Sequence, residues 1–222
     1  MNAPPGQVLV VVAYDSGSRG AVTLRGRTAA LATAIVHGAR TVRGTHVLNM
    51  HLGDQEPDWD ALDAASAIIF GCPTYMGSGS ARMKAFMEES LHPQFLERRW
   101  QDKLAGGFTN SAGMSGDKLC TLQQIAGFAA QHGMIWISLG QLPGWQSSNG
   151  SAADPNRLAS FLGLMAQSNS DQGPDRAPPE SDRRTGELFG RRVALITHRW
   201  VEATQRADDG RATAGQASNE AS

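Results

Sequence analysis

The chain is poor in cysteine and carries almost no net charge. Of its 222 residues only two are cysteines, and the formal net charge is −1. Cys72 and Cys120 belong to no Cys-x-x-Cys or Cys/His spacing, so neither a disulfide framework nor a zinc site is supported. We therefore expect two free thiols and no bound metal.

A long apolar run and a basic leader are also missing. No stretch approaches the roughly 20 apolar residues that cross a bilayer, and the first residues lack the basic and apolar parts of a secretory signal. The near-zero net charge gives no electrostatic footprint for nucleic acid. We therefore expect a soluble, cytoplasmic protein that neither enters a membrane nor binds nucleic acid.

What the sequence does contain is an alternation of short apolar runs and helical patterns. The apolar runs are residues 7–13, 45–50, 67–70, 104–109 and 134–139. Apolar residues at helical spacing occupy residues 28–39, 58–65, 81–89 and 119–132. Such alternation predicts an α/β fold, a doubly wound five-stranded parallel sheet with helices on both faces.

The last third of the chain departs from this alternation. Asp154 and Pro155 pair a good N-cap with proline at the first helical position, which predicts a helix over residues 157–166. A final helix is expected at about residues 185–204. We expect a single domain over residues 1–204, with long loops at 140–155 and 168–182 and a disordered tail at 205–222.

The most informative segment is residues 67–80, where an apolar strand ends in a loop and a helix follows. Ligands of open α/β sheets bind at this carboxyl end of the strands. Pro73 stiffens the loop, Gly77 lets backbone approach a ligand, and Thr74 and Tyr75 offer hydroxyls and an aromatic face. The mixture suits a planar ring with polar edges, although the loop alone fits an ordinary strand-to-helix turn equally well.

The first strand ends in a second such loop, over residues 13–28. Hydroxyls, glycines and free amides at the amino end of a helix favour an anion, so we expect a phosphate here. Arg19, Arg25 and Arg27 add positive charge. The segment has neither a Walker sequence nor a Gly-x-Gly-x-x-Gly fingerprint, and a merely flexible Ser/Gly/Arg loop stays open as the alternative.

A third small, polar loop follows the fourth strand, over residues 109–118. Asn110 and Ser111 offer donors and acceptors to the edge of a ring, whereas Asp117 and Lys118 read as a helix-capping pair. With a strand order of 2-1-3-4-5, the loops after strands one, three and four meet where the order reverses. A mononucleotide binds at that point in this architecture.

Four motifs, in order over residues 8–139, resemble those of the flavodoxin-like FMN proteins of the WrbA type, which are NAD(P)H:quinone oxidoreductases. They are Tyr14-Asp-Ser-Gly with Arg25-Gly-Arg-Thr, Gly71-Cys-Pro-Thr-Tyr-Met-Gly, Thr109-Asn-Ser-Ala with Ser115-Gly-Asp-Lys, and His132-Gly-Met. The loop that begins at Gly71 is the most specific of them. Relative to the family pattern, residues 18–24 look inserted into the phosphate loop.

The resemblance implies a flavodoxin-like fold with bound FMN and names the residues that would hold it. The phosphate would be held by Ser16, Gly17, Arg25, Gly26, Arg27 and Thr28. The flavin ring would be flanked by Pro73, Thr74, Tyr75, Met76 and Gly77, and its other edge by Thr109, Asn110, Ser111, Ala112, Gly116 and Asp117. The resemblance also places His132 beside the flavin and makes His132 and Tyr75 the catalytic candidates. From the residues alone, His132 reads as a polar helix-end residue before Gly133.

The activity implied by the resemblance is hydride transfer from NAD(P)H to FMN, followed by two-electron reduction of a quinone-like acceptor. The resemblance also implies a homodimer or homotetramer. A flavodoxin-type electron carrier without its own NAD(P)H-oxidising activity is the alternative, and a chain that keeps the fold without FMN is a third reading. Near-neutral charge and long extra loops favour the enzyme, since such carriers tend to be short and acidic.

Overall fold

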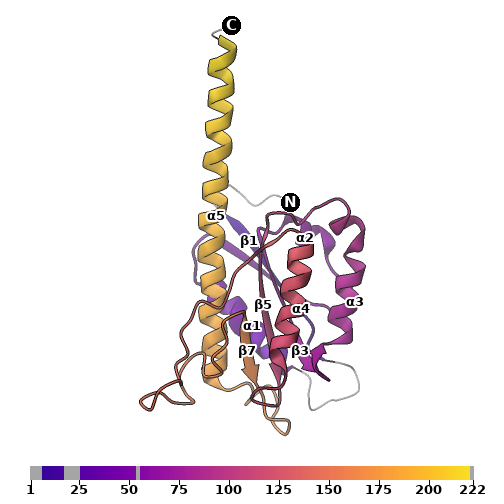
Figure 1. Ribbon diagram of the computed structural model, residues 1–222, viewed down its shortest axis with the longest axis vertical. Coiled ribbons are helices and arrows are strands. Elements are labelled where there is room, and N and C mark those ends of the chain that lie inside the picture. Colours follow the sequence, from indigo (N-terminus) through magenta and orange to yellow (C-terminus); the bar gives the residue numbers. More distant parts are fainter. Residues whose placement is uncertain (1–6, 18–25, 54–55, 221–222) are drawn as a thin grey trace.

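A parallel sheet forms the centre of the molecule in the computed structural model, which describes residues 7–17, 26–53 and 56–220, and side chains as far as residue 207 (Figure 1). Its strands are β1 (Val8–Tyr14), β2 (Thr45–His51), β3 (Ala67–Tyr75), β5 (Leu104–Ser111) and β6 (Ile135–Trp136). They are ordered β2-β1-β3-β5-β6. Because the short β4 (Ser78–Gly79) lies off this path, β5 is the fourth predicted strand, and the order 2-1-3-4-5 is confirmed.

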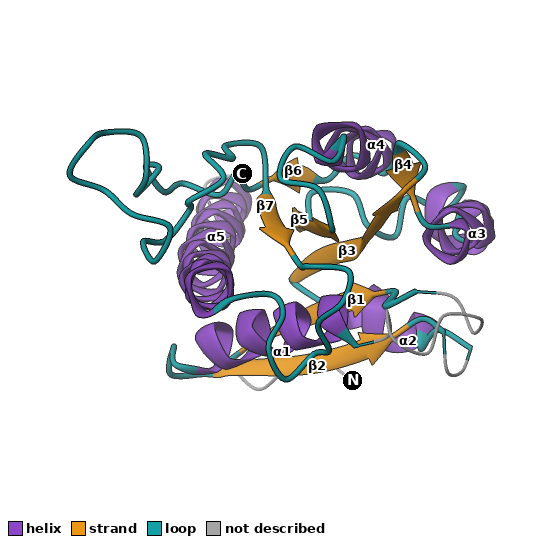
Figure 2. Ribbon diagram, turned by 90° about the horizontal axis from the view of Figure 1, so that it is seen from below, coloured by secondary structure: helices purple, strands orange, loops and turns teal. Residues whose placement is uncertain are grey.

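Helices cover both faces of the sheet, as the alternating pattern predicts (Figure 2). The helices α1 (Arg27–Arg40) and α5 (Glu180–Glu220) pack on one face. The helices α2 (Trp59–Ala64), α3 (Ala81–Glu89) and α4 (Lys118–Gln131) pack on the other. Successive residues of a strand point to opposite faces, so Val10 and Val12 face α1 and α5, whereas Val11 and Ala13 face the other helices. Burial on both faces explains the continuous apolar runs in the sequence.

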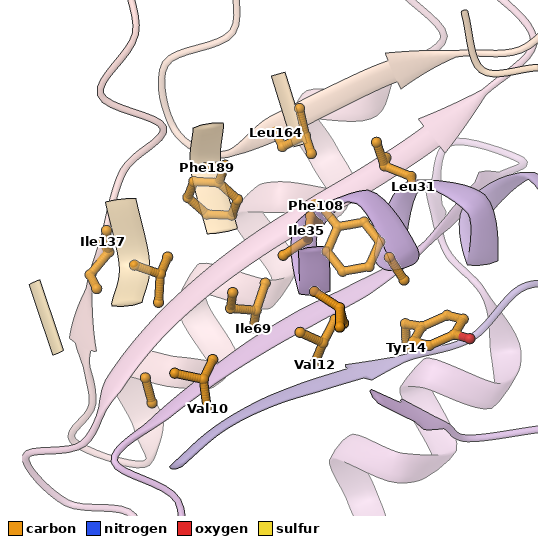
Figure 3. Packing of buried hydrophobic residues seen from close by; sticks show 14 of the residues in the cluster. Val10, Val12, Tyr14, Leu31, Ile35, Ile69, Phe108, Ile137, Leu164 and Phe189 are labelled. Atoms are coloured by element: carbon orange, nitrogen blue, oxygen red, sulfur yellow. The ribbon is translucent and has the colours of Figure 1, made fainter. Parts of the chain in front are cut away.

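The core beneath α1 and α5 brings together side chains from these two helices and from the strands of the sheet (Figure 3). Phe108 of β5 and Phe189 of α5 are fully buried there. The two helices themselves approach to backbone contact, because a Cβ atom on Gly190 would lie 2.0 Å from the carbonyl oxygen of Ile35. A Cβ atom on Gly38 would lie 1.8 Å from the carbonyl oxygen of Glu187. Glycine at both crossing points is therefore what lets α5 lie against α1.

The position of the fifth strand is shared by two short strands. β6 pairs with the start of β5 at Leu104 and Ala105, and β7 (Leu164–Gln167) pairs with its end, from Phe108 to Ser111. The segment 137–163 between β6 and β7 is thus an insertion into the fifth strand position. We refer to it below as the inserted segment.

The prediction of a helix over residues 157–166 is wrong, because this stretch leads into the strand β7 instead. The carboxylate of Asp154 closes a turn on Ser151 rather than capping a helix. Asn156 and Ala159 have φ angles of 51° and 54°, which an α-helix excludes. The side chain of Asn156 bonds instead to backbone groups of Ser160 and Gln141.

The last helix is longer than the sequence pattern predicts. α5 begins at Glu180, inside the loop expected at 168–182, and continues to Glu220, where a disordered tail was expected from residue 205. Figure 1 shows its carboxyl-terminal half extending away from the sheet. Residues 205–220 contain no proline and several good helix formers, so nothing in the sequence stops the helix. No helix among the described residues is both long and apolar enough to cross a membrane.

Candidate functional site

A cavity of about 970 Å³ opens at the carboxyl edge of β1 and β3. Pockets for small ligands have volumes of about 300–1,000 Å³. Its walls come from the ends of β1 and β2, the amino end of α1, and the turn that joins β3 to α3. The order of the strands reverses between β1 and β3, so the cavity lies at the topological switch point predicted from the sequence.

Between β1 and α1, the described residues 15–17 and 26–29 meet at one hydroxyl group. Ser16 Oγ accepts hydrogen bonds from the backbone amides of Gly26 and Ala29, both at 3.1 Å. Gly17 and Gly26 have φ angles of 97° and 91°, which only glycine adopts without strain. Asp15, which the sequence reasoning did not single out, lines the cavity too, and its Oδ1 accepts a hydrogen bond from the Gly17 amide at 3.2 Å. Three of the predicted phosphate residues therefore line the amino end of α1.

The other three predicted phosphate residues differ in where they lie. Arg25 falls outside the described residues. Arg27 is buried, and its Nη1 donates to the carbonyl oxygens of Ser168 and Asn169 at 3.3 and 2.5 Å, which ties α1 to the segment after β7. Thr28 is buried in the first turn of α1.

The loop after β3 is a tight hairpin rather than a plain strand-to-helix turn. Tyr75 pairs with Ser78 across a two-residue turn, in which Met76 and Gly77 have φ angles of 48° and 82°. Positive φ at both turn positions is typical of a type I′ hairpin. The Met76 side chain is fully exposed at the tip.

Tyr75 reaches across the cavity to the loop after β1. A Cβ atom on Gly17 would lie 2.5 Å from the Tyr75 hydroxyl, so the two loops touch here. Burial and the charge of Asp15 raise the pKa of Tyr75 above its usual value of 10.0. The hydroxyl is consequently protonated at neutral pH and available as a donor.

Two predicted ring-edge residues, Thr74 and Thr109, turn their hydroxyls into the protein. Thr74 Oγ1 lies 2.8 Å from Thr109 Oγ1 and 2.7 Å from Thr121 Oγ1, and Thr109 Oγ1 donates to the Cys72 carbonyl at 2.7 Å. All three threonine side chains are buried. Their hydroxyls therefore join the ends of β3, β5 and α4 by hydrogen bonds within the chain. Pro73 lies within β3, near its carboxyl end, and pairs with Asn110 of β5.

The loop after β5 closes around the ammonium of Lys118. Lys118 Nζ donates to Ser111 Oγ at 2.8 Å and to the Gly113 carbonyl at 2.5 Å, and the residue is fully buried. Asp117 occupies the N-cap of α4 with a φ of 52°, and its side chain makes no capping hydrogen bond. The capping pair read from the sequence is thus replaced by a buried lysine that holds its own loop.

Residues behind this loop fix it from the outside. Gln167 Nε2 donates to the Ala112 carbonyl at 2.9 Å. Asp182, on α5, accepts hydrogen bonds from the Gln167 amide and from two nitrogens of Arg157, with Nε to Oδ1 at 2.7 Å. The Arg157–Asp182 pair is almost completely buried, so the inserted segment and α5 are both anchored beside the predicted site. The Asn110 side chain, in turn, accepts from Ser168 Oγ at 3.0 Å.

His132 lies away from the cavity and from the three loops described above. It lies at the carboxyl end of α4, where its Nε2 is 3.0 Å from Ser90 Oγ and its ring is 4.5 Å from that of Trp100. The next residue, Gly133, accepts a hydrogen bond from the Asp102 amide just before β5 begins, which places His132 at the amino edge of the sheet. Burial lowers its pKa to about 4. Within one chain, then, His132 lies at the opposite edge of the sheet from the cavity, and its place beside a flavin stays a prediction.

Comparison with known proteins places these features in a family. A family model described as NADPH-dependent FMN reductase matches residues 58–144. The chain is 40% identical over 186 residues to flavodoxin FldP of Pseudomonas aeruginosa, an alignment that covers 84% of this chain and 95% of that one. It is 28% identical over 140 residues to an NAD(P)H dehydrogenase (quinone) of Archaeoglobus fulgidus, which is 63% of each chain. The solved structure of a flavodoxin, WrbA-like protein from Agrobacterium tumefaciens superposes with a TM-score of 0.66 at 35% identity, covering 87% of this chain and 99% of that one.

Proposed function

Because the chain belongs to the FMN-binding flavodoxin-like family, we propose that it is an oxidoreductase that passes a hydride from NAD(P)H to FMN and then two electrons to a quinone-like acceptor. The observation that carries the proposal is the cavity at the switch point. The loops after β1 and β3 line it, and the loop after β5 follows the strand beside β3. In this architecture a mononucleotide binds outside the carboxyl ends of the strands, at the switch point.

The residues at the amino end of α1 fit the phosphate of FMN. Gly17 and Gly26 hold left-handed backbone, and a Cβ atom on either would meet a neighbour, at 2.5 Å from Tyr75 Oη or 3.1 Å from Pro174 Cγ. Backbone amides at a helix amino end attract an anion. Ser16, Gly17, Gly26 and Thr28 would therefore hold the phosphate, with the buried charge of Arg27 behind them.

The hairpin and the loop after β5 fit the two sides of a flat ring. Pro73 and Asn110 are paired in neighbouring strands, so the loops that follow them stand side by side. On this proposal Tyr75, Met76 and Gly77 flank one side of the ring, and Ser111, Ala112, Gly116 and Asp117 flank the other. When bound, the flavin ring supplies the hydride and electron chemistry, and the protein supplies position and surroundings.

Few side chains are needed for the chemistry itself. The protonated Tyr75 hydroxyl can donate a hydrogen bond at the cavity wall, and exposed Met76 offers an apolar contact to an acceptor at the tip of the hairpin. Backbone amides of the loop after β5 can stabilise negative charge on the ring edge. His132 has no part in the proposal.

A flavodoxin-type electron carrier is the second candidate, and the 40% identity to a protein named flavodoxin favours it. The two candidates differ in whether the bound flavin reacts with a nicotinamide. The chain's near-neutral charge and its match to the NADPH-dependent FMN reductase family favour the enzyme.

The deciding experiment is anaerobic reduction of the FMN-loaded chain. NADH or NADPH is added, the loss of flavin absorbance is followed, and a quinone is then added to follow its return. The proposal predicts reduction by at least one of the two nucleotides and reoxidation by the quinone. Bound flavin that dithionite reduces but neither nucleotide does would identify a carrier instead.

A further inference from the structure

We propose that Lys118 is a positioning residue for FMN: its ammonium holds the loop 111–117 in the shape that receives the flavin ring. The inference rests on the proposed function, because it assigns a role toward the same cofactor. It concerns a residue that the sequence pattern places merely at the start of a helix.

The loop is folded around the ammonium group. Lys118 Nζ donates to Ser111 Oγ at 2.8 Å and to the Gly113 carbonyl at 2.5 Å. A Cβ atom on Gly116 would lie 3.2 Å from Nζ and 2.2 Å from Ser111 Oγ, so glycine is required where the loop returns over the lysine. Both ends of the loop and its centre thus contact one fully buried side chain.

Within the loop itself, Ser111 Oγ also donates to the Gly113 carbonyl at 3.3 Å, a longer bond than either of those from the ammonium. The backbone passes through left-handed conformations at Gly116 and Asp117, with φ angles of 55° and 52°. The N-cap of α4 has no side-chain hydrogen bond to fix the entry of the helix. From outside, Gln167 holds the Ala112 carbonyl at 2.9 Å. Removing the ammonium would therefore leave the Ser111 hydroxyl without its donor and the Gly113 carbonyl with only the longer bond from Ser111 Oγ, so the loop would be held less firmly.

The position of the loop 111–117 relates its shape to the binding of a ligand. Asn110, immediately before it, pairs with Pro73, immediately before the β3–β4 hairpin. The two loops consequently stand side by side at the carboxyl edge of the sheet, and the fit of a ring bound between them would depend on where the loop 111–117 stands. The ammonium also contributes a positive charge that favours an anionic ligand such as FMN.

The charges around Lys118 come from two neighbouring elements. Asp182 of α5 and Arg157 of the inserted segment face it, with opposite effects on its proton affinity, and the two are paired with each other. Burial has the largest effect and lowers the pKa of Lys118 from 10.5 to about 8. The lysine is charged at neutral pH and loses its charge in mildly alkaline solution.

Lys103 offers a matched control. Its Nζ also donates to backbone carbonyls, those of Asp63 and Ala65, and burial also lowers its pKa. It stands immediately before β5, at the amino edge of the sheet and at the opposite end from the cavity. Lys103→Met thus removes a similar interaction without touching the loop 111–117.

The test measures the dissociation constant of FMN for the wild-type chain, Lys118→Met and Lys103→Met by quenching of flavin fluorescence, with urea unfolding of each chain alongside. We expect Lys118→Met to weaken FMN binding about tenfold at neutral pH and Lys103→Met to change it less than about twofold, because the ammonium donates two hydrogen bonds to the loop. Wild-type binding should also weaken between about pH 7 and about pH 9 as the ammonium deprotonates, and Lys118→Met should lack this step.

The outcomes separate the inference from the function on which it rests. A folded Lys118→Met chain that binds FMN as tightly as the wild type overturns the inference and leaves the proposed function intact. If Lys118→Met does not fold, wild-type affinity that is unchanged over the alkaline range overturns it equally. A wild-type chain that binds no FMN contradicts the proposed function itself.

Discussion

Buried polar side chains shape the edge of the cavity from behind. The hydroxyls of Thr74, Thr109 and Thr121 bond to one another, and Lys118 bonds to the loop above it. Leaving any of these groups buried without a partner would cost about 1–3 kcal/mol. Much of the polar character of the predicted loops therefore stabilises the loops themselves, and backbone groups remain to meet a ligand.

His132 provides a residue-scale prediction about pH. Its pKa is about 4 in the folded chain against an ordinary value of 6.5, so the unfolded chain binds the extra proton between these values. Its contribution to stability should be complete above about pH 6.5 and decline as the pH falls toward about 4. The free energy lost by His132→Gln, measured by urea unfolding, should therefore be larger at about pH 7 than at about pH 4.5.

The control for this prediction is His37→Gln, on the exposed face of α1. It should change stability by less than about 0.5 kcal/mol at neutral pH. His132→Gln should leave the affinity for FMN unchanged, because the residue lies at the opposite edge of the sheet. A loss of FMN affinity in this variant would restore His132 to the site and show that the single chain is not the binding unit.

The residues of the site could be predicted only in part, because a sequence motif does not tell which way a side chain points. That Ser16, Gly17 and Gly26 lie on the cavity wall was predictable, since these residues stand between the end of a parallel strand and the start of a helix. The direction of Thr74 depends on Thr121, which comes from a helix much later in the chain. Lys118 reads from the sequence as half of a helix-capping pair with Asp117, and its burial depends on the loop before it, which closes over it.

At the scale of elements, the contact between α1 and α5 depends on glycine. Gly190→Ala should destabilise the fold by about 1–3 kcal/mol, since its Cβ would lie 2.0 Å from a backbone oxygen of α1 that cannot move aside. Gly127→Ala on α4 is the matched variant, because that glycine is also helical but has nothing within 4 Å of an added Cβ. It should stabilise the chain by about 0.5–1 kcal/mol. Urea unfolding that shows the same change for both variants would contradict the close packing of the two helices.

Periodicity predicted the first four strands and all five α-helices, α5 over only part of its length, because each has its own apolar pattern. The apolar run at residues 134–139 predicted the strand that became β6, but its continuation as β7 could not be predicted, since β6 and β7 meet only through their shared partner β5 and are separated by the inserted segment. Leu158, Phe161, Leu162 and Met165 have helical spacing, yet the left-handed backbone at Asn156 and Ala159 and the pairing with β5 override it. Such a long-range pairing leaves no local signal in the sequence.

At the scale of the whole molecule, the fold brings distant parts of the chain to one edge. The sheet places the ends of β1, β3 and β5 side by side, and the reversal of strand order opens the cavity between the first two. The inserted segment and α5 then brace the third loop through the Arg157–Asp182 pair. The central claim is that this edge holds FMN, and that the amino end of α1 holds the phosphate.

The measurement that tests this claim most directly is a calorimetric titration of the full chain with FMN and, separately, with riboflavin, which lacks the phosphate. The account predicts a dissociation constant for FMN of about 1 μM or tighter and riboflavin binding at least about tenfold weaker. Equal affinity for the two, or no binding of FMN, would contradict it.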